Sequence, residues 1–526
     1  MADAPPGFVR VPNRGIITAC TMAATIMQAL DSTIANVALP YMQGSLSATY
    51  DEITWVLTSY VTAAAIMTAP VGWLATRFGR KNLYLVCVIG FTIASMLCGA
   101  AQSLPEMVAF RVLQGVFGAA LVPLSQATML DIYPPEHRGS AMALWGVGVM
   151  LGPILGPTLG GYLTDWYNWR FVFYVNLPIG IAATLGMIFF MPKGLAQSSL
   201  RFDWIGFAVL SLGIGGLQMM LDRGQNQDWF SSPEIIAEAV LCGLGFYLFG
   251  VHMLTARNPF IKPAIFRDRN LVAGTLMMFA VGSVLLASSA LLAPWLQNLS
   301  GYPVAITGLL LAPRGIGTMI AMLIGGRLSA RYDPRLLMLV GLLILIYSMW
   351  MMTAWTPDIS EWSVFICVML QGAGLGLVFV PLQVLSFWSL PAQYRTDATA
   401  LLSLFRNVGS AIGVSVMSAM LARHQQVLHQ EIGAAITPFN RALQVGGGVG
   451  QYWPIAPTPG AVVTPQQGLA ILDAVVNRQA EIIAYLDDFK LMMLTTIPAI
   501  LLLLLLRRPK TTQAQPADEG HHAVMD

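Results

Sequence analysis

Charged residues are scarce in this sequence, which argues against a soluble fold. Only 10% of the 526 residues are Asp, Glu, Lys or Arg, whereas 56% are hydrophobic, and the mean hydropathy is +0.66. Soluble domains carry about 25% charged residues. The five cysteines all lie in apolar stretches, so we expect no disulfide framework. The composition therefore predicts a membrane protein.

Several chemical motifs are also missing. No segment matches the phosphate-binding pattern Gly-x-x-x-x-Gly-Lys-Ser/Thr, so ATP-driven pumping by this chain is not expected. The six histidines show no metal-ligand spacing with one another or with cysteine, and no hydrolase triad is visible. We therefore expect no enzymatic activity, no metal, no cofactor and no nucleic-acid partner.

Long apolar runs recur along the whole chain, each long enough to cross about 30 Å of hydrocarbon. We count fourteen: 15–39, 53–75, 83–101, 106–130, 139–163, 170–191, 203–222, 234–254, 271–297, 304–329, 336–354, 362–388, 399–422 and 486–506. The first run is too long for a signal-peptide core, so we interpret it as a retained span. The runs predict an all-α membrane protein with fourteen transmembrane helices.

The basic residues alternate between the two sides of these runs. If the N-terminus lies inside, 19 of the 28 Lys and Arg fall in cytoplasmic segments, six lie outside and three lie within runs. Short cytoplasmic loops are enriched in Lys and Arg. Both termini are therefore predicted to be cytoplasmic, and the polar tail 508–526 is predicted to be disordered.

The chain contains an internal duplication. "GWLATRFGRKNL" at 72–83 matches "GRLSARYDPRLL" at 326–337, and "PPEHR" at 134–138 matches "LPAQYR" at 390–395 with nearly the same spacing. Both copies fall on one membrane side, as in a parallel repeat with a central cavity. We predict a six-helix bundle in 1–200, an inserted transmembrane hairpin in 201–262, and a second six-helix bundle in 263–507 that includes an outer segment, 423–485.

Two ionisable residues inside the runs are candidates for proton coupling. Asp31 lies about 12 Å and Arg111 about 8 Å from the outer side, so the two side chains can meet. A carboxylate that alternates between an arginine partner and an apolar cavity can bind and release a proton. Arg111 aligns with Val368 in the second repeat, and 271–297 contains no acid. This asymmetry favours a coupling pair, although a structural ion pair would give the same pattern.

Other polar residues within the runs are candidates for lining the cavity. They are Gln28, Asn36, Gln126, Arg314, Gln371, Arg406 and Asn407. Each has an alternative interpretation, because polar side chains also bond between helices and a long arginine near a helix end can reach the membrane surface.

Two glycine-containing motifs are interpreted as moving or closing parts. In "GWLATRFGRK", the predicted inner gate consists of Gly72, Arg77, Gly79, Arg80 and Lys81, whose basic side chains can also bond helix-end carbonyls. In "GVGVMLGPILGPTLGGYL", the predicted seam consists of Gly148, Gly152, Pro153, Gly156, Pro157, Gly160 and Gly161. Glycines four residues apart allow two helices to touch, and the prolines allow bending.

These motifs carry a family resemblance. "LDSTIANVALP", "GWLATRFGRK", "RVLQGVFGAA" and "GPILGPTLGG" resemble successive motifs of the fourteen-span drug:proton antiporters (EmrB/QacA-type) of the major facilitator superfamily. "WYNWRFVFYVNLPIG" and "LDRGQNQDWFSSPEII" resemble the EmrB-type branch in particular. The resemblance places Asp31 and Arg111 on the family's coupling positions and the glycine stripe on its antiporter motif.

The resemblance implies a bacterial inner-membrane exporter that exchanges protons for amphipathic, often uncoupler-like compounds. Pumps of this type work with a periplasmic adaptor and an outer-membrane channel, so the resemblance implies a docking or capping role for the outer segment. One position departs from the family, because Thr76 stands where the gate motif usually has Asp. The usual gate charge pair therefore cannot form, and closure must depend on Arg77, Arg80 and other partners.

Two other functions remain open from the sequence. The chain could be a narrow exporter of one metabolite, such as a fatty acid or siderophore, or a non-transporting membrane sensor that uses its cavity to detect ligands. Competition by unrelated dyes separates the first from a multidrug exporter, and binding without flux identifies the second.

Overall fold

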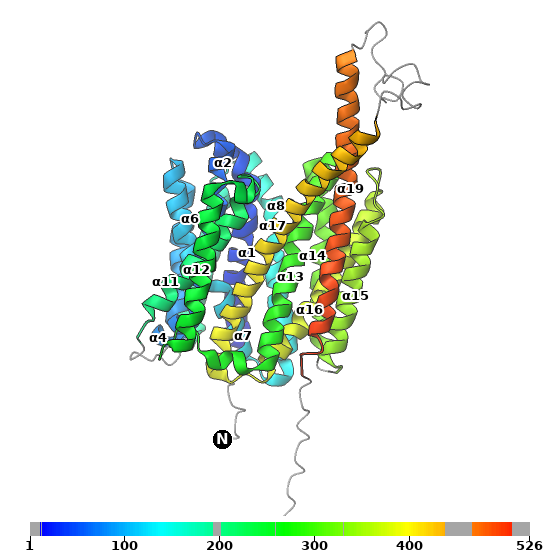
Figure 1. Ribbon diagram of the computed structural model, residues 1–526. Helices are drawn as coiled ribbons and strands as arrows, with labels where there is room; N and C mark the ends of the chain where they lie inside the picture. The colour runs from blue at the N-terminus through cyan, green and yellow to red at the C-terminus, as the bar shows by residue number, and fades with distance from the viewer. Residues whose placement is uncertain are drawn as a thin grey trace, which may run out of the picture.

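The computed structural model describes residues 11, 13–192, 201–257, 259–329, 331–436 and 465–507. All regular structure in these ranges is helical, as predicted, and the long helices run side by side (Figure 1). The α-helices are α1 (Arg14–Ser45), α2 (Tyr50–Ile53), α3 (Trp55–Thr68), α4 (Val71–Phe78), α5 (Arg80–Ala100), α6 (Leu104–Gly118), α7 (Leu121–Ile132), α8 (Arg138–Trp166), α9 (Phe171–Tyr174), α10 (Asn176–Phe190), α11 (Trp204–Arg223), α12 (Pro233–Thr255), α13 (Arg269–Pro294), α14 (Val304–Leu328), α15 (Pro334–Met352), α16 (Glu361–Trp388), α17 (Arg395–Ala435) and α19 (Pro465–Leu502).

Each predicted apolar run falls on a helix or on consecutive helices. By length and composition, 11 helices in the described ranges can cross a membrane, or 12 if the bent pair α3–α4 is one span. Large apolar side chains such as Phe189, Leu254 and Leu309 are 71–79% exposed, as expected for a surface that faces lipid. These features are those of a multi-pass membrane protein.

The predicted run 53–75 is broken into α3 and α4, whose axes differ by 59°. Pro70 lies at the break, and because it lacks a backbone N–H it cannot continue the hydrogen-bond ladder of α3. The bend carries α4 into contact with α17. This contact lies at the end of the bundle where α1 begins, which we call the N-terminal end.

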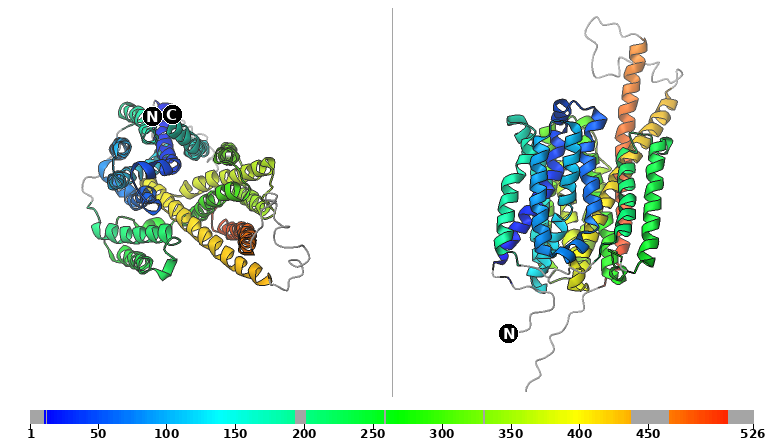
Figure 2. Two further views of the ribbon diagram at one scale, coloured as in Figure 1. Left: turned by 90° about the horizontal axis from the view of Figure 1, so that it is seen from above. Right: turned by 90° about the vertical axis from the view of Figure 1, so that its left-hand side faces the viewer.

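The helices form two neighbouring groups. In the first, α1 packs on α8 and α10, and α6 packs on α3 and α5; in the second, α13 packs on α17, and α16 packs on α14 and α15. From above, these groups occupy opposite sides of the molecule, and α17 runs from the centre to the edge (Figure 2). Helices α11 and α12 pack together, and α11 contacts both α3 and α17.

The repeat seen in the sequence recurs in the local structure. A 3-10 turn at Pro135–His137 leads directly into α8, and a 3-10 turn at Ala392–Tyr394 leads in the same way into α17. These are the two segments that match as "PPEHR" and "LPAQYR". Both helices therefore enter the bundle through the same short turn.

The two flanks of the predicted outer segment 423–485 are helical. Helix α17 has 41 residues and α19 has 38, and their far ends extend beyond the other helices (Figure 1). Residues 423–432 contain neither glycine nor proline, so nothing interrupts the helix there. Two His–Asp contacts join the extensions, His424–Asp488 at 3.3 Å and His429–Asp473 at 3.0 Å. The segment 437–464 and the tail 508–526 lie outside the described residues.

Candidate functional site

The two candidate coupling residues form a direct ion pair between α1 and α6. Arg111 Nη1 lies 2.8 Å from Asp31 Oδ2, and both side chains are 0% exposed. The other carboxylate oxygen of Asp31 accepts hydrogen bonds from Gln114 Nε2 at 2.8 Å and from Asn176 Nδ2 at 3.2 Å. A buried carboxylate is tolerated only with such partners, and three donors satisfy this one.

Arg111 is fixed by groups from several helices. Its Nε donates to the carbonyl of Val56 at 2.9 Å, and its Nη1 also donates to Gln114 Oε1 at 2.8 Å. The guanidinium lies 4.3 Å from the centre of the Tyr60 ring, within the range of a cation–π contact. Its Nη2 has no hydrogen-bond partner within the described ranges. The guanidinium therefore has one nitrogen, with two N–H groups, still available for another acceptor.

A cavity of about 570 Å³ lies next to this pair. Its wall is mostly apolar and includes Val149, Met322, Leu375 and Phe379, from α8, α14 and α16. Of the predicted polar residues, the wall contains Gln28, Asn36, Arg111, Arg406 and Asn407. Asp31 does not line the cavity but pairs with Arg111, which does, so the candidate coupling acid is one side chain away from the chamber.

The structure places the other three predicted cavity residues elsewhere. Gln126 donates to Gln383 at 2.6 Å, across the interface between α7 and α16. Arg314 binds three oxygens of α13, those of Ser289, the Leu285 carbonyl and Ser288. The side-chain amide of Gln371 is buried and has no hydrogen-bond partner among the residues described. All three lie between helices, where polar side chains also take part in helix–helix packing.

The predicted gate motif lies at the N-terminal end and reaches across both groups of helices. Arg80 pairs with Asp131 of α7, which also accepts from Arg395 of α17 at 2.8 Å. Arg80 Nη2 donates to Thr396 Oγ1 at 2.9 Å. One carboxylate thus joins two arginines from opposite halves of the sequence.

The remaining gate residues have different partners. Lys81 donates to the carbonyls of Ile188 and Met191 at 2.8 and 2.6 Å, at the end of α10. Gly79 has a φ of 81°, a conformation that favours glycine between two helices. Thr76, at the position where the resemblance leads us to expect Asp, donates to the Gly72 carbonyl within its own helix. The side chain of Arg77 makes no hydrogen bond or ion pair with the part of the chain that the structure describes.

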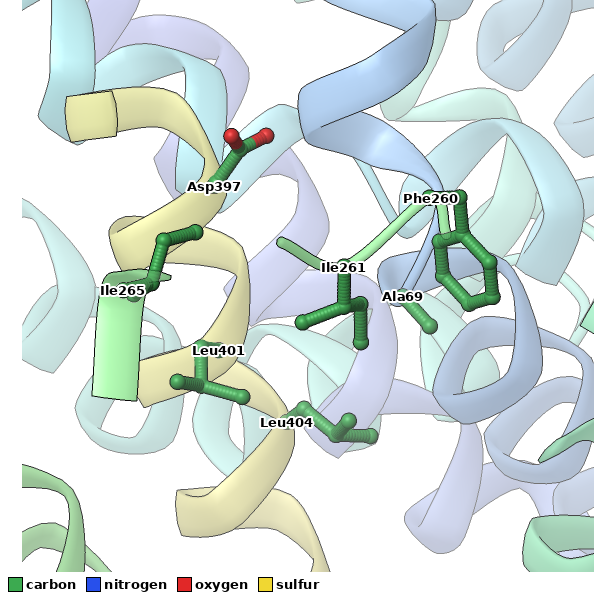
Figure 3. Close-up of a pocket in the computed structure, with 7 residues that line it drawn as sticks. All are labelled: Ala69, Phe260, Ile261, Ile265, Asp397, Leu401 and Leu404. Carbon is green, nitrogen blue, oxygen red and sulfur yellow. The ribbon is translucent and has the colours of Figure 1, made fainter. Parts of the chain in front are cut away.

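Gly72 allows α4 and α17 to touch. A Cβ at this position would overlap the carboxyl group of Asp397, in the first turn of α17. Asp397 also borders a small pocket whose other walls are apolar (Figure 3), and its carboxyl group is turned away from these side chains. The pocket is lined by Ala69, Phe260, Ile261, Ile265, Leu401 and Leu404. Glycine at position 72 is therefore required for the close contact between α4 and α17.

The glycine stripe of α8 packs on α1. Added Cβ atoms would overlap Ala29 at Gly152, Thr33 at Gly156 and Ile34 at Gly160, whereas a Cβ at Gly161 would have no described atom of a neighbouring residue within 4 Å. Thr33 Oγ1 donates to the carbonyl of Gly152 at 3.1 Å. A Cβ added at Gly148 would lie 3.1 Å from Met22 Cε, a looser contact. Pro153 and Pro157 lie within the same helix. The stripe thus brings α8 against the segment of α1 that carries Asp31.

Comparison of the sequence with models of protein families identifies the family of this chain. The model of the Major Facilitator Superfamily matches residues 21–414, which include the ion pair and most of the cavity wall. The chain belongs to this superfamily. It is therefore a membrane transporter.

Two relatives of this facilitator match most of its length. It is 37% identical over 433 residues to the multidrug export protein EmrB of Escherichia coli (strain K12), covering 81% of this chain and 83% of that protein. It is 35% identical over 421 residues to the fatty acid resistance protein FarB of Neisseria gonorrhoeae, covering 80% and 83%. The resemblance to EmrB-type members is thereby confirmed.

A solved structure shows the same fold. The human organic anion transporter MFSD10 (TETRAN) superposes with a TM-score of 0.58 at 15% identity, covering 92% of this chain and 99% of that one. At this identity the likeness concerns the fold alone. The helices of the facilitator therefore have the arrangement of a known transporter.

The sequence-based prediction did not include several site residues of this facilitator. Gln114 and Asn176 bind Asp31, and both lie in quoted motifs, "RVLQGVFGAA" and "WYNWRFVFYVNLPIG". Asp131 joins the arginines of the gate. Gln218, Asp222 and Gln225, at the end of α11, line the cavity. Nothing in the composition of a span indicates which polar side chains converge, so only the position of Gln114, three residues after Arg111, gave a signal.

Proposed function

We propose that this facilitator exports amphipathic compounds from a bacterial cell in exchange for protons, by alternating access. It would lie in the inner membrane with fourteen spans and both termini in the cytoplasm, as two six-helix bundles (1–200 and 263–507) and an inserted hairpin (201–262). The resemblance to EmrB, a multidrug export protein, favours a broad range of substrates.

The observation that carries the proposal is the position of the buried pair Asp31–Arg111. The pair lies at the wall of a largely apolar cavity, and Arg111 is part of that wall. When a proton neutralises the carboxylate, the ionic attraction to Arg111 is lost, and the guanidinium, which then keeps its bonds to Val56 and Gln114, can turn further towards the cavity. Proton binding at Asp31 and substrate binding in the cavity are thereby linked through a single side chain, which is what exchange requires.

The arrangement of the helices favours an outward-facing state. The Arg80–Asp131–Arg395 cluster joins the helices at the N-terminal end, and Gly139 of α8 meets the backbone of Gly326 of α14 there. The cavity instead includes the exposed residues Asn36 and Gln225 nearer the opposite end. Opening to the cytoplasm would then require the cluster to separate, in keeping with rocking of one bundle against the other.

A tripartite assembly is the second part of the proposal. The extended ends of α17 and α19 project beyond the bundle on the side opposite to the N-terminal end (Figure 1). Their length and position suit contact with a periplasmic adaptor protein, which would pass substrate to an outer-membrane channel. Deletion of these extensions should then abolish resistance in cells but leave transport in vesicles.

Transport in everted membrane vesicles tests the exchange function. An imposed proton gradient should drive accumulation of an amphipathic dye, and an uncoupler should abolish it. Asp31→Asn should lose the gradient-driven uptake while still inserting in the membrane at the wild-type level. Undiminished gradient-driven uptake by Asp31→Asn would reduce the acid to a structural role.

A narrower function, export of a fatty acid, is the second candidate. Arg406 favours it, because its guanidinium lines the cavity and forms no ion pair with any described carboxylate. FarB, a fatty acid resistance protein, is also among the similar proteins. Competition separates the candidates: a narrow exporter is inhibited by oleate and ignores unrelated dyes, whereas a broad exporter is inhibited by both.

A further inference from the structure

The end of α11 forms part of the cavity wall. Gln218, Leu221 and Asp222 line the cavity from this helix, and Gln225 lines it just beyond the helix end. The partner helix α12 instead exposes large apolar side chains such as Tyr247 and Leu254, at 69% and 79%. The two helices of the hairpin therefore have different surroundings, and only α11 turns polar groups to the chamber.

Two hydrogen bonds hold the end of α11 between the two halves of the molecule. Thr58 Oγ1, on α3, donates to the carboxylate of Asp222. Ser415 Oγ, on α17, donates to the carbonyl of Leu221 at 3.1 Å. The Asp222 carboxylate is thus held at the cavity wall by α3, which belongs to the first group of helices. Its own helix, α11, is also bonded to α17 of the second group.

Within the part of the chain that the structure describes, no ion pair neutralises the negative charge of Asp222. Its neighbour Arg223 is paired with Glu234 and lies 3.7 Å from Glu238, both on α12. Arg111 is occupied by Asp31, and no ion pair joins Arg406 to Asp222 in the described ranges. Thr58 supplies a neutral donor only, which fixes the carboxylate without cancelling its charge. Asp222 is therefore an acid that lines the cavity and is available to a positively charged group.

We propose that α11 contacts substrate as part of the cavity wall, and that Asp222 is the residue that favours amphipathic cations among the substrates of the facilitator. A cationic group would lie beside the Asp222 carboxylate, with the apolar body against Met322, Leu375 and Phe379 across the cavity. The hairpin then contributes to specificity in addition to lateral packing. This inference rests on the proposed export function, and the test below separates the two.

The test measures transport by Asp222→Asn in vesicles with a permanently cationic dye, ethidium, and a neutral dye, Nile red. We expect the KM for ethidium to rise about two- to fivefold, because one partly exposed charge contact is lost. The KM for Nile red should change little. Asp222→Glu should restore the KM for ethidium. Asp228→Asn is the matched control, because Asp228 lies in the same hairpin and does not line the cavity.

The outcomes are distinct. An equal change for both dyes, or none for ethidium, would overturn the role of Asp222, as would a wild-type protein that transports Nile red and ignores ethidium. A wild-type protein that moves neither dye in response to a proton gradient would instead overturn the proposed export function.

Discussion

Arg111 holds Asp31 at 2.8 Å while its Nε donates to the backbone of α3, so one guanidinium ties α6 to two other helices. The geometry depends on the fork of the arginine, which makes separate bonds through Nε and Nη1. A lysine keeps the charge but has a single nitrogen and cannot reach Asp31, Gln114 and Val56 together.

Arg111→Lys should therefore impair both folding and coupling although the charge is conserved. We expect a loss of about 2–4 kcal/mol in stability, because the substitution leaves buried polar groups unpaired. Thermal unfolding of the detergent-solubilised protein and gradient-driven uptake measure the two effects. Wild-type uptake by Arg111→Lys would mean that a positive charge alone is sufficient at this position.

Asp131→Asn should weaken closure of the N-terminal end. An amide has one acceptor oxygen and no charge, so it cannot hold Arg80 and Arg395 as the carboxylate does. The closed state should lose about 1–2 kcal/mol, because Arg80 and Asp131 are partly exposed. Spin labels at the exposed positions Asn82 and Gln393 would report longer distances in the variant. Identical distance distributions would show that other contacts hold the end shut.

Gly152→Ala should separate α8 from α1, since the added methyl group would overlap the backbone of Ala29. We expect a loss of about 1–3 kcal/mol, typical of overpacking. The control is Gly161→Ala, where the added group has open space within 4 Å and the helix gains the higher propensity of alanine. The melting temperatures of the two variants are compared. Equal melting temperatures would show that the glycine stripe is not needed for packing against α1.

Much of the fold follows from the sequence, because membrane-crossing helices depend on local composition. The apolar runs coincide with helices, and the matching segments "PPEHR" and "LPAQYR" both form a turn before a long helix. The break at Pro70 was not predicted, although proline supplies the physical reason. Both sides of that break are apolar, so hydropathy alone shows one continuous run.

The partners of the polar residues were harder to predict than their depth. The depths of Asp31 and Arg111 are set by helix rise, and the structure pairs them as expected. Which other side chains meet them depends on helix rotation, which hydropathy does not determine. Gln126 shows the limit: its depth suits the cavity, but its rotation turns it to Gln383 across the interface.

Arg314 and Arg406 look equivalent in the sequence and differ in the structure. The guanidinium of Arg314 makes three hydrogen bonds to α13, at 2.5, 2.7 and 2.8 Å, and does not line the central cavity. Arg406 lines that cavity and forms no hydrogen bond or ion pair with its side chain in the described part of the chain. Because an intramembrane arginine without a partner is costly for folding, we predict that Arg406 has a role in substrate binding.

Replacing each arginine with methionine should separate these roles. Arg314→Met should lower stability by about 2–3 kcal/mol, because Ser288, Ser289 and the Leu285 carbonyl lose their donor, while uptake per folded molecule is retained. Arg406→Met should leave stability unchanged or raise it, and should weaken uptake of an anionic dye such as fluorescein by about tenfold, or about 1.4 kcal/mol. Melting temperature and uptake kinetics, measured on both variants, decide the assignment. If Arg406→Met unfolds more readily than Arg314→Met and transports the anion normally, Arg406 is a structural residue and the cavity recognises anions by other groups.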